Sequence, residues 1–514
     1  MGVFVVGFMV FVLLVLVSFV RLGGVGVSGN VVFEVQHKFG VVGNESLSGY
    51  VAHDMYRHRR ILAGVDLPIG GDSSPTSAAL YYTKIQLGSP AKEFYVQVDT
   101  GSDILWVNCA GCENCPQKSD LGVPLSLYDP DQSLSSGTVT CDQDFCTTMV
   151  DPTNNECVLG SQCSYVVRYG DGSSTTGYFV RDNVQLNRIS GDRQTSDMQG
   201  RIMFGCGSKQ SGGLGKSQQA LDGILGFGQS NASLISQLAA SKKVKKMFSH
   251  CLSGSKGGIF AIGEVVHPEV NSTPILPDMT HFNIELKAIQ VGDEFVTLPT
   301  KMFNTAAKRG TVIDSGTTLA YFPDPVYNQL MKKVTRILIF SRITFPYKIS
   351  LTVEYWTQVA ASQSEADMQI VDNQFKCYPA HGNVDDVFPI VIFHFANALK
   401  LRVYPHQYIF TTQHPYWCIG FMSNGMQPRE SNAVLLGDLL LTDRLVTYNM
   451  EDQTIGWTDY DCSSSIRVKD EESGMVYEVG AHDISWTRSG AGRSNVSVFV
   501  LLVFIIATKL VMYE

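Results

Sequence analysis

The sequence has no extended patch of basic residues. Its 39 Lys and Arg are outnumbered by 48 Asp and Glu, which gives a net charge of −9. Nucleic acid is therefore not expected as a partner, because its recognition depends on a basic surface. Charged residues make up 17% and apolar residues 44% of the 514 residues. This composition is that of an ordinary globular protein with ample material for a core.

Several catalytic motifs are also missing. The sequence contains no H-E-x-x-H zinc motif and no G-x-S-x-G nucleophile motif. The stretch QSGGLGKS resembles a phosphate-binding loop, but Gln210 stands where that loop requires its first Gly. We interpret it as a surface loop, and we expect no metal and no other cofactor.

Long apolar runs occur at the two ends of the chain. The first extends from Val3 to Val20 and is followed by Arg21 and small residues. We interpret residues 1–29 as a secretory signal peptide. No Lys or Arg precedes the run, and its length also allows an uncleaved membrane anchor.

The second apolar run, Val496 to Thr508, is short for a transmembrane helix. Small residues and a polar spacer precede it, as in the signal for a glycolipid (GPI) anchor. We therefore predict an anchor signal at 489–514 and a stalk at 463–488. The alternative is a short membrane span in which Lys509 reaches the lipid surface.

Twelve cysteines indicate a protein that is exported to an oxidising compartment, where disulfides persist. Seven lie between Cys109 and Cys163, so if all twelve are paired, one of the seven bonds Cys206, Cys251 or a later cysteine. The C-x-x-C-x-x-C spacing of Cys109, Cys112 and Cys115 leaves a metal site as the alternative. The disulfide candidates are Cys109, Cys112, Cys115, Cys141, Cys146, Cys157, Cys163, Cys206, Cys251, Cys377, Cys418 and Cys462. Candidate glycosylation sites in the same compartment are Asn44, Asn231 and Asn271.

The body of the chain, residues 79–462, is rich in short β-branched and aromatic runs bounded by Gly, Pro, Asn or Asp. This pattern predicts an all-β fold with few short helices. Helices are expected at NASLISQLAAS, with Asn231 as N-cap, and at PDPVYNQLMKKVTRIL. Residues 30–78 contain the basic cluster YRHRR and are interpreted as a separate arm or prosegment.

Two phrases of the sequence are nearly the same: FYVQVDTGSDILWV around Asp99 and RGTVIDSGTTLAYF around Asp314. Each is followed, at similar spacing, by two apolar residues and a Gly, in DGILGFG and in AVLLGD. This double repeat predicts two similar lobes, at 79–275 and 276–462. If the lobes face each other, Asp99 and Asp314 meet. Two adjacent carboxylates share a proton and so offer one acid and one base.

At this point the chain resembles the pepsin family of aspartic endopeptidases, over about Tyr81 to Cys462. The resemblance rests on both Asp loops, the flap-like VVRYGDGSSTTG and the two apolar-apolar-Gly elements. The cysteine-rich insert and FGCG are similar to the plant nepenthesin-like subgroup. The resemblance implies a two-lobed acid-protease fold.

The resemblance also implies roles for single residues. Thr100 and Ser315 would join the two loops under the Asp99–Asp314 dyad. Ser102 and Thr317 would hold the carboxylates, and Tyr169 would be the flap tyrosine that Trp106 hydrogen-bonds. The positions implied for substrate binding are Gly101, Gly170, Asp171, Gly316 and Thr317. Asp103 and Asp171 are acidic where pepsin is neutral, and nearby negative charge raises the pKa of a carboxyl.

The implied function is an aspartic endopeptidase with an acidic optimum and no metal. We expect a monomer, a peptide or protein substrate, and a zymogen in which Arg57, Arg59 and Arg60 pair with carboxylates of the cleft. The expected location is extracellular, or the outer face of the cell membrane through the lipid anchor. The rival interpretations are a catalytically silent inhibitor on the same fold, as in xylanase-inhibitor-like relatives, and a surface protein that binds peptides uncut.

Overall fold

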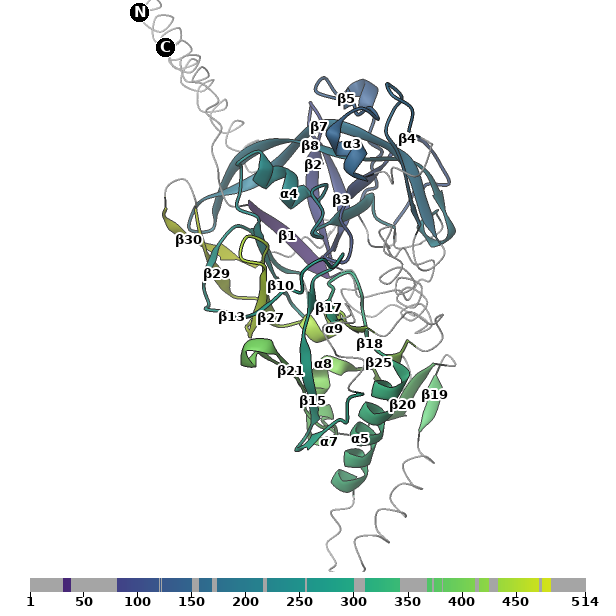
Figure 1. The fold of residues 1–514 in the computed structure, drawn as a ribbon, viewed down its shortest axis with the longest axis vertical. Coiled ribbons are helices and arrows are strands. Elements are labelled where there is room, and N and C mark those ends of the chain that lie inside the picture. The colour runs from purple at the N-terminus through teal and green to yellow at the C-terminus, as the bar shows by residue number, and fades with distance from the viewer. Residues whose placement is uncertain are drawn as a thin grey trace, which may run out of the picture.

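The structure is a computed structural model, and this description covers the following residues: 31–37, 81–119, 121, 123–149, 157–168, 173–215, 220–254, 257–299, 310–342, 368–371, 374–380, 382–411, 416–424, 433–470 and 474–481. In Figure 1 the N-terminal half, purple to blue, forms the upper lobe and the green segments form the lower lobe. Strands dominate both lobes and helices are short, which confirms the predicted all-β class.

A fourteen-stranded sheet forms the N-terminal lobe and continues into the region between the lobes. Its order is β13-β28-β27-β10-β11-β1-β2-β3-β9-β4-β8-β7-β5, with β6 paired to β7. Its strands from the first part of the chain are β1 Val31–His37, β2 Tyr81–Leu87, β3 Lys92–Asp99, β4 Leu105–Glu113, β5 Gly137–Thr138, β6 Ser164–Arg168, β7 Ser174–Gly191, β8 Gln194–Ser211, β9 Gly223–Gly226, β10 Met247–Leu252, β11 Gly258–Ile262 and β13 Asn271–Pro274. Its strands from the C-terminal part are β27 Arg444–Asn449 and β28 Thr454–Asp459.

Smaller sheets build the C-terminal lobe, in the orders β14-β17-β26-β18-β25, β16-β15-β21-β22 and β19-β20-β24-β23. The strands are β14 Asn283–Ile284, β15 Leu286–Val291, β16 Glu294–Phe295, β17 Thr311–Ile313, β18 Ala320–Phe322, β19 Gln369–Val371, β20 Phe375–Pro379, β21 Val391–Phe395, β22 Lys400–Val403, β23 Ile409–Thr411, β24 Tyr416–Ile419, β25 Phe421–Ser423 and β26 Val434–Leu436.

The two helices predicted from sequence are present as α4 and α5, but the predicted cap of α4 is wrong. Ser233, not Asn231, is the N-cap, and its hydroxyl accepts the main-chain N–H of Ser236. A hydroxyl directly before the first helical turn satisfies a free N–H there, and Asn231 lies two residues too early. The α-helices are α3 Asp144–Met149, α4 Leu234–Ala240, α5 Asp324–Arg342, α7 Val384–Val387, α8 Pro405–Tyr408 and α9 Asp438–Leu441, and the 3-10 turns are η1 Pro130–Gln132, η2 Gly212–Gly215 and η4 Ala396–Ala398.

The strands that join the lobes are buried on both faces. Every residue of β10 and of β11 is buried. Phe248 and Leu252 of β10 belong to the main hydrophobic core, which extends through both lobes, while Cys251 belongs to a second cluster on the opposite face. β10 pairs with β27 from the C-terminal part of the chain, so one continuous ladder connects the lobes.

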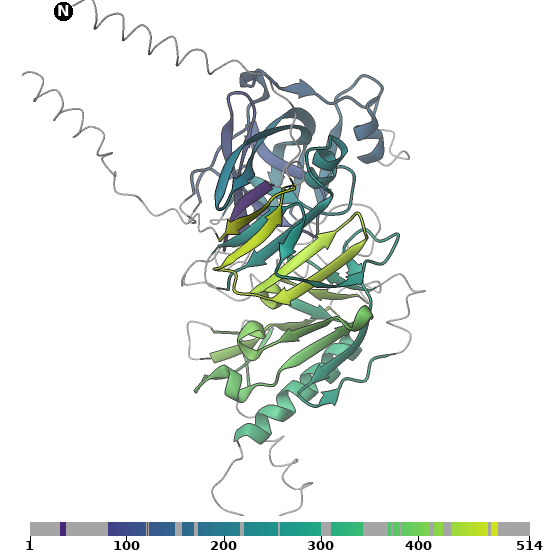
Figure 2. The same cartoon turned by 90° about the vertical axis from the view of Figure 1, so that its left-hand side faces the viewer.

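Residues 465–470 and 474–480 correct the predicted stalk at 463–488, because they fold as part of the body. β29 (Ser465–Lys469) and β30 (Val476–Gly480) form a hairpin, and β29 also pairs with β12 (Val265–His267). In Figure 2 this yellow end of the chain lies against the middle of the molecule. The apolar-polar alternation of Ile466, Arg467 and Val468 is typical of a half-buried strand, and Ile466 and Val468 are buried.

An ion pair attaches this hairpin to the N-terminal lobe. Arg188 of β7 contacts the nearly buried Asp470 at 3.1 Å. Nearby, β1, from the predicted prosegment, lies between β11 and β2 and also pairs with β7 at Arg188. The two ends of the described chain therefore meet beside the sheet that joins the lobes.

Candidate active site

The two sequence repeats occupy equivalent places in the two lobes. Asp99 is the last residue of β3, and Asp314 directly follows β17. The predicted backing elements are also equivalent, since β9 runs parallel to β3 and β26 runs parallel to β17. Both aspartates are buried. Each apolar-apolar-Gly element therefore lies beside its Asp loop, as the double repeat predicts.

In the N-terminal loop the carboxylate of Asp99 accepts two local hydrogen bonds. The main-chain N–H of Gly101 donates to Oδ1 at 2.9 Å, and the Ser102 hydroxyl donates to Oδ2 at 2.5 Å. The side-chain contact is the one that the resemblance implied for Ser102. These bonds hold the carboxyl plane in one orientation at the end of its strand.

The C-terminal loop repeats this arrangement. Gly316 N–H donates to Oδ1 of Asp314 at 2.9 Å, and the Thr317 hydroxyl donates to Oδ2 at 2.6 Å. Different residue types, Ser in one loop and Thr in the other, place a hydroxyl at the same atom of the carboxylate. Two copies of one local structure therefore hold both acids.

Thr100 and Ser315 join the two loops directly. The main-chain N–H of Ser315 donates to Oγ1 of Thr100 at 2.9 Å, and the main-chain N–H of Thr100 donates to Oγ of Ser315 at 3.3 Å. Both residues are buried. Thr100 directly follows Asp99 in the chain, and Ser315 directly follows Asp314. The two hydrogen bonds between Thr100 and Ser315 therefore bring the two aspartates to one site.

Glycines allow the backing strands to approach the loops. A Cβ at Gly226 would lie 2.5 Å from the main-chain carbon of Asp103, and one at Gly437 would lie 2.4 Å from the carbonyl oxygens of Thr317 and Leu319. Such distances leave no room for a side chain. This is the physical reason why both backing elements end in Gly.

Asp103 is buried in the N-terminal lobe, in the loop that follows Asp99. Its Oδ1 accepts the main-chain N–H of Ser230 at 3.0 Å. Burial raises its pKa to about 6, and the charge of Asp99 adds to that rise, whereas the Ser230 hydrogen bond and Lys246 oppose it. The extra acidic residue is visible in the sequence, but its closeness to Asp99 depends on the fold.

Trp106 lies on β4 and is buried. Among the described residues its indole N–H has no acceptor. Tyr169, Gly170 and Asp171 lie outside the described residues. The strands that flank them, β6 and β7, are antiparallel neighbours with Arg168 opposite Ser174.

Tyr448 of β27 lies near the site but outside both repeated phrases. Burial is the main cause that raises its pKa, and the charge of Asp314 adds to that rise. Its hydroxyl lies 3.2 Å from Nε2 of His250. The sequence carries no local signal for this contact, because Tyr448 lies far from His250 in the chain and reaches it only through strand pairing.

All twelve cysteines are paired. Cys109 bonds Cys206, as the odd count of seven required, and Cys112 bonds Cys115, so none of these three offers a thiolate to a metal in this structure. The remaining disulfides are Cys141–Cys157, Cys146–Cys163, Cys251–Cys462 and Cys377–Cys418.

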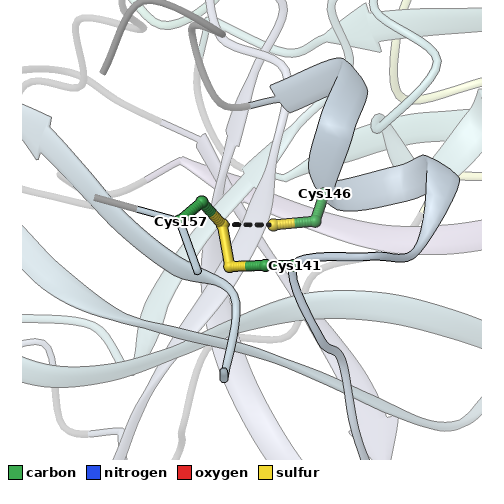
Figure 3. Close-up of side chains that lie close together, drawn as sticks. All are labelled: Cys141, Cys146 and Cys157. Atoms are coloured by element: carbon green, nitrogen blue, oxygen red, sulfur yellow. Dashed lines mark hydrogen bonds between the residues drawn. A yellow bond between two sulfur atoms is a disulfide. The ribbon is translucent and has the colours of Figure 1, made fainter. Parts of the chain in front are cut away.

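Two disulfides of the cysteine-rich insert lie in contact. Figure 3 shows the Cys141–Cys157 bond with Cys146 beside it, and the sulfur atoms of Cys146 and Cys157 are 3.5 Å apart. Cys146 itself bonds Cys163 at the start of the strands that lead to the flap. The insert therefore braces the base of that hairpin.

The remaining predictions concern the surface and the ends. Asn231 and Asn271 are exposed, as glycosylation requires, while Asn44 lies outside the described residues. The apolar runs at both ends and the basic cluster at Arg57, Arg59 and Arg60 also lie outside them. Within the described residues, no helix is long and apolar enough to span a membrane.

Comparison with known proteins supports this architecture. Two family models match the chain, Xylanase inhibitor N-terminal over residues 81–264 and Xylanase inhibitor C-terminal over residues 281–459. Aspartic proteinase 36 of Arabidopsis thaliana is 46% identical over 483 residues, which cover 93% of this chain and 94% of that protein. Aspartic proteinase 39 of the same plant is 43% identical over 460 residues, with 89% and 90% covered.

A solved structure gives the fold independently. The crystal structure of EDGP superposes with a TM-score of 0.58 at 15% identity, covering 85% of this chain and 96% of that one. The fold and the paired loops define a two-lobed pepsin-like protein. The chain belongs to the plant family of pepsin-like aspartic proteinases and proteinase-like proteins.

Proposed function

We propose that this protein is an aspartic endopeptidase in which Asp99 and Asp314 hydrolyse peptide bonds with one water. The observation that carries the proposal is the complete double arrangement of the loops. Each aspartate accepts a main-chain N–H and a hydroxyl, and Thr100 and Ser315 bond each other between them. A scaffold used only for binding has no need for both acids and all their partners.

The chemistry follows from the closeness of two equal acids. Two adjacent carboxylates retain one proton between them over the acidic range, because charging both is costly. The ionised member accepts a proton from the water as the water oxygen attacks the peptide carbonyl carbon. The protonated member donates its proton to the carbonyl oxygen, which gives a tetrahedral diol.

The second half of the reaction returns the protons. The protonated carboxyl donates its proton to the amide nitrogen while the ionised carboxylate takes a proton from one diol hydroxyl. The carbon–nitrogen bond then breaks, a carboxylic acid and an amine leave, and the dyad again holds one proton. The bonds from Gly101 and Ser102, and from Gly316 and Thr317, keep the outer edges of the carboxylates occupied during both steps. The need for exactly one dyad proton is the reason to expect an acidic optimum.

The biological setting is part of the same proposal. Twelve paired cysteines suit an oxidising, extracytoplasmic compartment. We take residues 1–29 as the signal peptide, 30–78 as a prosegment and 489–514 as a lipid-anchor signal. Release of the protein from membranes by a phosphatidylinositol-specific lipase tests the anchor, and failure of that release favours a membrane span.

The test of the activity is cleavage of a denatured protein by the purified full chain, from about pH 3 to 7, a range that spans the expected carboxyl titration. The proposal expects cleavage at acidic pH that pepstatin blocks and that Asp99→Asn abolishes. The Asp99→Asn preparation excludes a contaminating protease. Absence of cleavage at every pH contradicts the proposal.

One observation favours a second function: the two family models that match the chain are named for xylanase inhibitors. On this alternative the chain is a catalytically silent inhibitor. The same preparation distinguishes the two when it is added to a xylanase assay. Inhibition of xylanase without peptide cleavage favours the inhibitor.

A further inference from the structure

Gln229 lies just after β9, the strand that backs the N-terminal loop. The main-chain N–H of Gly228 donates to the carbonyl oxygen of Ser102 at 2.7 Å, and the main-chain N–H of Ser230 donates to Oδ1 of Asp103 at 3.0 Å. A Cβ at Gly228 would lie 2.1 Å from the same Oδ1, so the two segments are in direct contact. The main chain on both sides of Gln229 is therefore fixed against the N-terminal loop.

The side chain of Gln229 extends to the segment that leads into β14 of the C-terminal lobe. Its Nε2 donates to the carbonyl oxygen of His281 at 2.6 Å and to the carbonyl oxygen of Met279 at 3.3 Å. A side-chain amide has two N–H donors, and here each donor has a main-chain acceptor. A single side chain therefore connects the support of the N-terminal loop to the C-terminal lobe.

The segment that accepts these bonds is attached to the strand that leads to the second aspartate. The main-chain N–H of Asn283 donates to the carbonyl oxygen of His281 at 2.9 Å, and the main-chain N–H of Ile313 donates to that of Phe282 at 3.2 Å. β14 also pairs with β17. Because Ile313 directly precedes Asp314, hydrogen bonds lead from the N-terminal loop through the Gln229 side chain to the start of the C-terminal loop.

We propose that Gln229 is a positioning residue for the catalytic pair, whose side chain forms a second bridge between the supports of the two loops. The proposal rests on the proposed peptidase function. Loops joined only through Thr100 and Ser315 can still turn about that contact, and a second bridge at a separate place prevents the turn. Both amide donors are engaged by main-chain carbonyl oxygens, so Gln229 acts through the loops and not on the reacting atoms.

Removal of the bridge should lower turnover more than substrate binding. Gln229→Met keeps the length of the side chain and removes both donors. We expect kcat to fall about tenfold with KM changed by less than about twofold, since small misplacements of reacting groups cost rate. Gln229→Asn keeps the amide but is one methylene too short to reach His281, so it loses kcat in the same way and serves as the second variant if Gln229→Met folds poorly.

A matched control is available in the same lobe. Nε2 of Gln237, in α4, also donates to two main-chain carbonyl oxygens, those of Met203 and Ala232, each at 2.8 Å. Both acceptors belong to the N-terminal lobe, so Gln237→Met removes the same kind of bonds without touching the connection between the lobes. Its kcat should stay at the wild-type value even if its unfolding temperature falls. Equal losses of kcat in Gln229→Met and Gln237→Met overturn the proposal, as does a wild-type kcat in folded Gln229→Met.

Amide hydrogen exchange in the full chain tests the bridge without any peptide cleavage. The main-chain N–H groups of Asn283 and Ile313 should exchange about tenfold faster in Gln229→Met than in the wild type, because local opening of this segment becomes easier. In Gln237→Met their exchange should not change. If the wild type fails to cleave peptides, the proposed function fails, yet the exchange rates still test the bridge. Unchanged exchange in Gln229→Met contradicts it.

Discussion

Thr100 and Ser315 each donate a main-chain N–H to the other's side-chain oxygen, at 3.3 Å and 2.9 Å, although 215 residues separate them. Each stands next to an aspartate that ends or follows a buried strand. The two bonds are therefore both part of the contact between the lobes and part of the frame of the active site. Stability and activity are expected to change together when this contact is altered.

Removal of the Thr100 hydroxyl tests that coupling. Thr100→Val keeps the shape of the side chain but leaves the buried N–H of Ser315 without its acceptor, which costs about 1–3 kcal/mol. Thermal or urea unfolding measures the loss, and peptide turnover should fall in the same variant. Thr83→Val is the control, because Thr83 is equally buried and its hydroxyl has no partner among the described residues. If Thr83→Val lowers the free energy of unfolding as much as Thr100→Val does, the hydrogen bond between Thr100 and Ser315 contributes no extra stability, which contradicts this prediction.

Gly437 is expected to tolerate no side chain. Its Cβ would meet the carbonyl oxygens of Thr317 and Leu319 at 2.4 Å, so Gly437→Ala must push β26 away from the Asp314 loop at a cost of at least about 3 kcal/mol. Gly137→Ala is the control, because the nearest atom would lie 3.5 Å away, in the Arg181 side chain. Unfolding midpoints of the two variants should differ clearly, and equal midpoints contradict the packing argument.

The disulfides are expected to differ in their effect on stability. Cys251–Cys462 closes a loop with a sequence separation of 211 and anchors the chain just before the β29–β30 hairpin, whereas Cys112–Cys115 spans 3. Replacement of both cysteines by Ser should cost about 2–5 kcal/mol at the first pair and less at the second, because a longer loop gains more freedom in the unfolded chain. Urea unfolding under non-reducing conditions ranks them, and the reverse order contradicts this account.

Asp103 should make stability depend on pH. Its pKa is about 6 in the folded protein, above the value of about 4 for an unfolded Asp. Between these values the folded state binds more protons, so this contribution is fully present below pH ~4 and is lost as the pH rises through ~6. Asp103→Asn removes the dependence while an amide oxygen can still accept from Ser230. The variant should be more stable than the wild type at pH 7 and similar at pH 4, whereas an equal difference at both values contradicts the assignment.

Much of the active site could be predicted from sequence, because its two halves are local. Each aspartate and the hydroxyl that holds it lie in one short turn: Asp99 with Ser102, and Asp314 with Thr317. Each turn is encoded by one copy of the repeated sequence phrase. The backing elements could also be predicted, since the spacing between phrase and Gly is similar in the two copies. A site whose two halves are short sequence segments of the same pattern can therefore be predicted from the sequence alone.

Contacts between distant strands could not be predicted in the same way. Tyr448 reaches His250, and Asp103 reaches Ser230, only because strand order and register bring them together. The hairpin of β29 and β30 could not be predicted for another reason: the family resemblance ends at Cys462, and the alternation around Arg467 spans too few residues to indicate a strand. The disulfide partners likewise depend on the completed fold.

The central claim is that Asp99 and Asp314 form one catalytic unit. The most direct measurement compares kcat/KM for peptide cleavage at acidic pH in the wild type, Asp99→Asn, Asp314→Asn and the double variant. The account predicts that each single change costs at least about 10³-fold and that the double change costs no more than either, because members of one unit are not additive. Substantial activity in either single variant, or losses that multiply in the double variant, would contradict it.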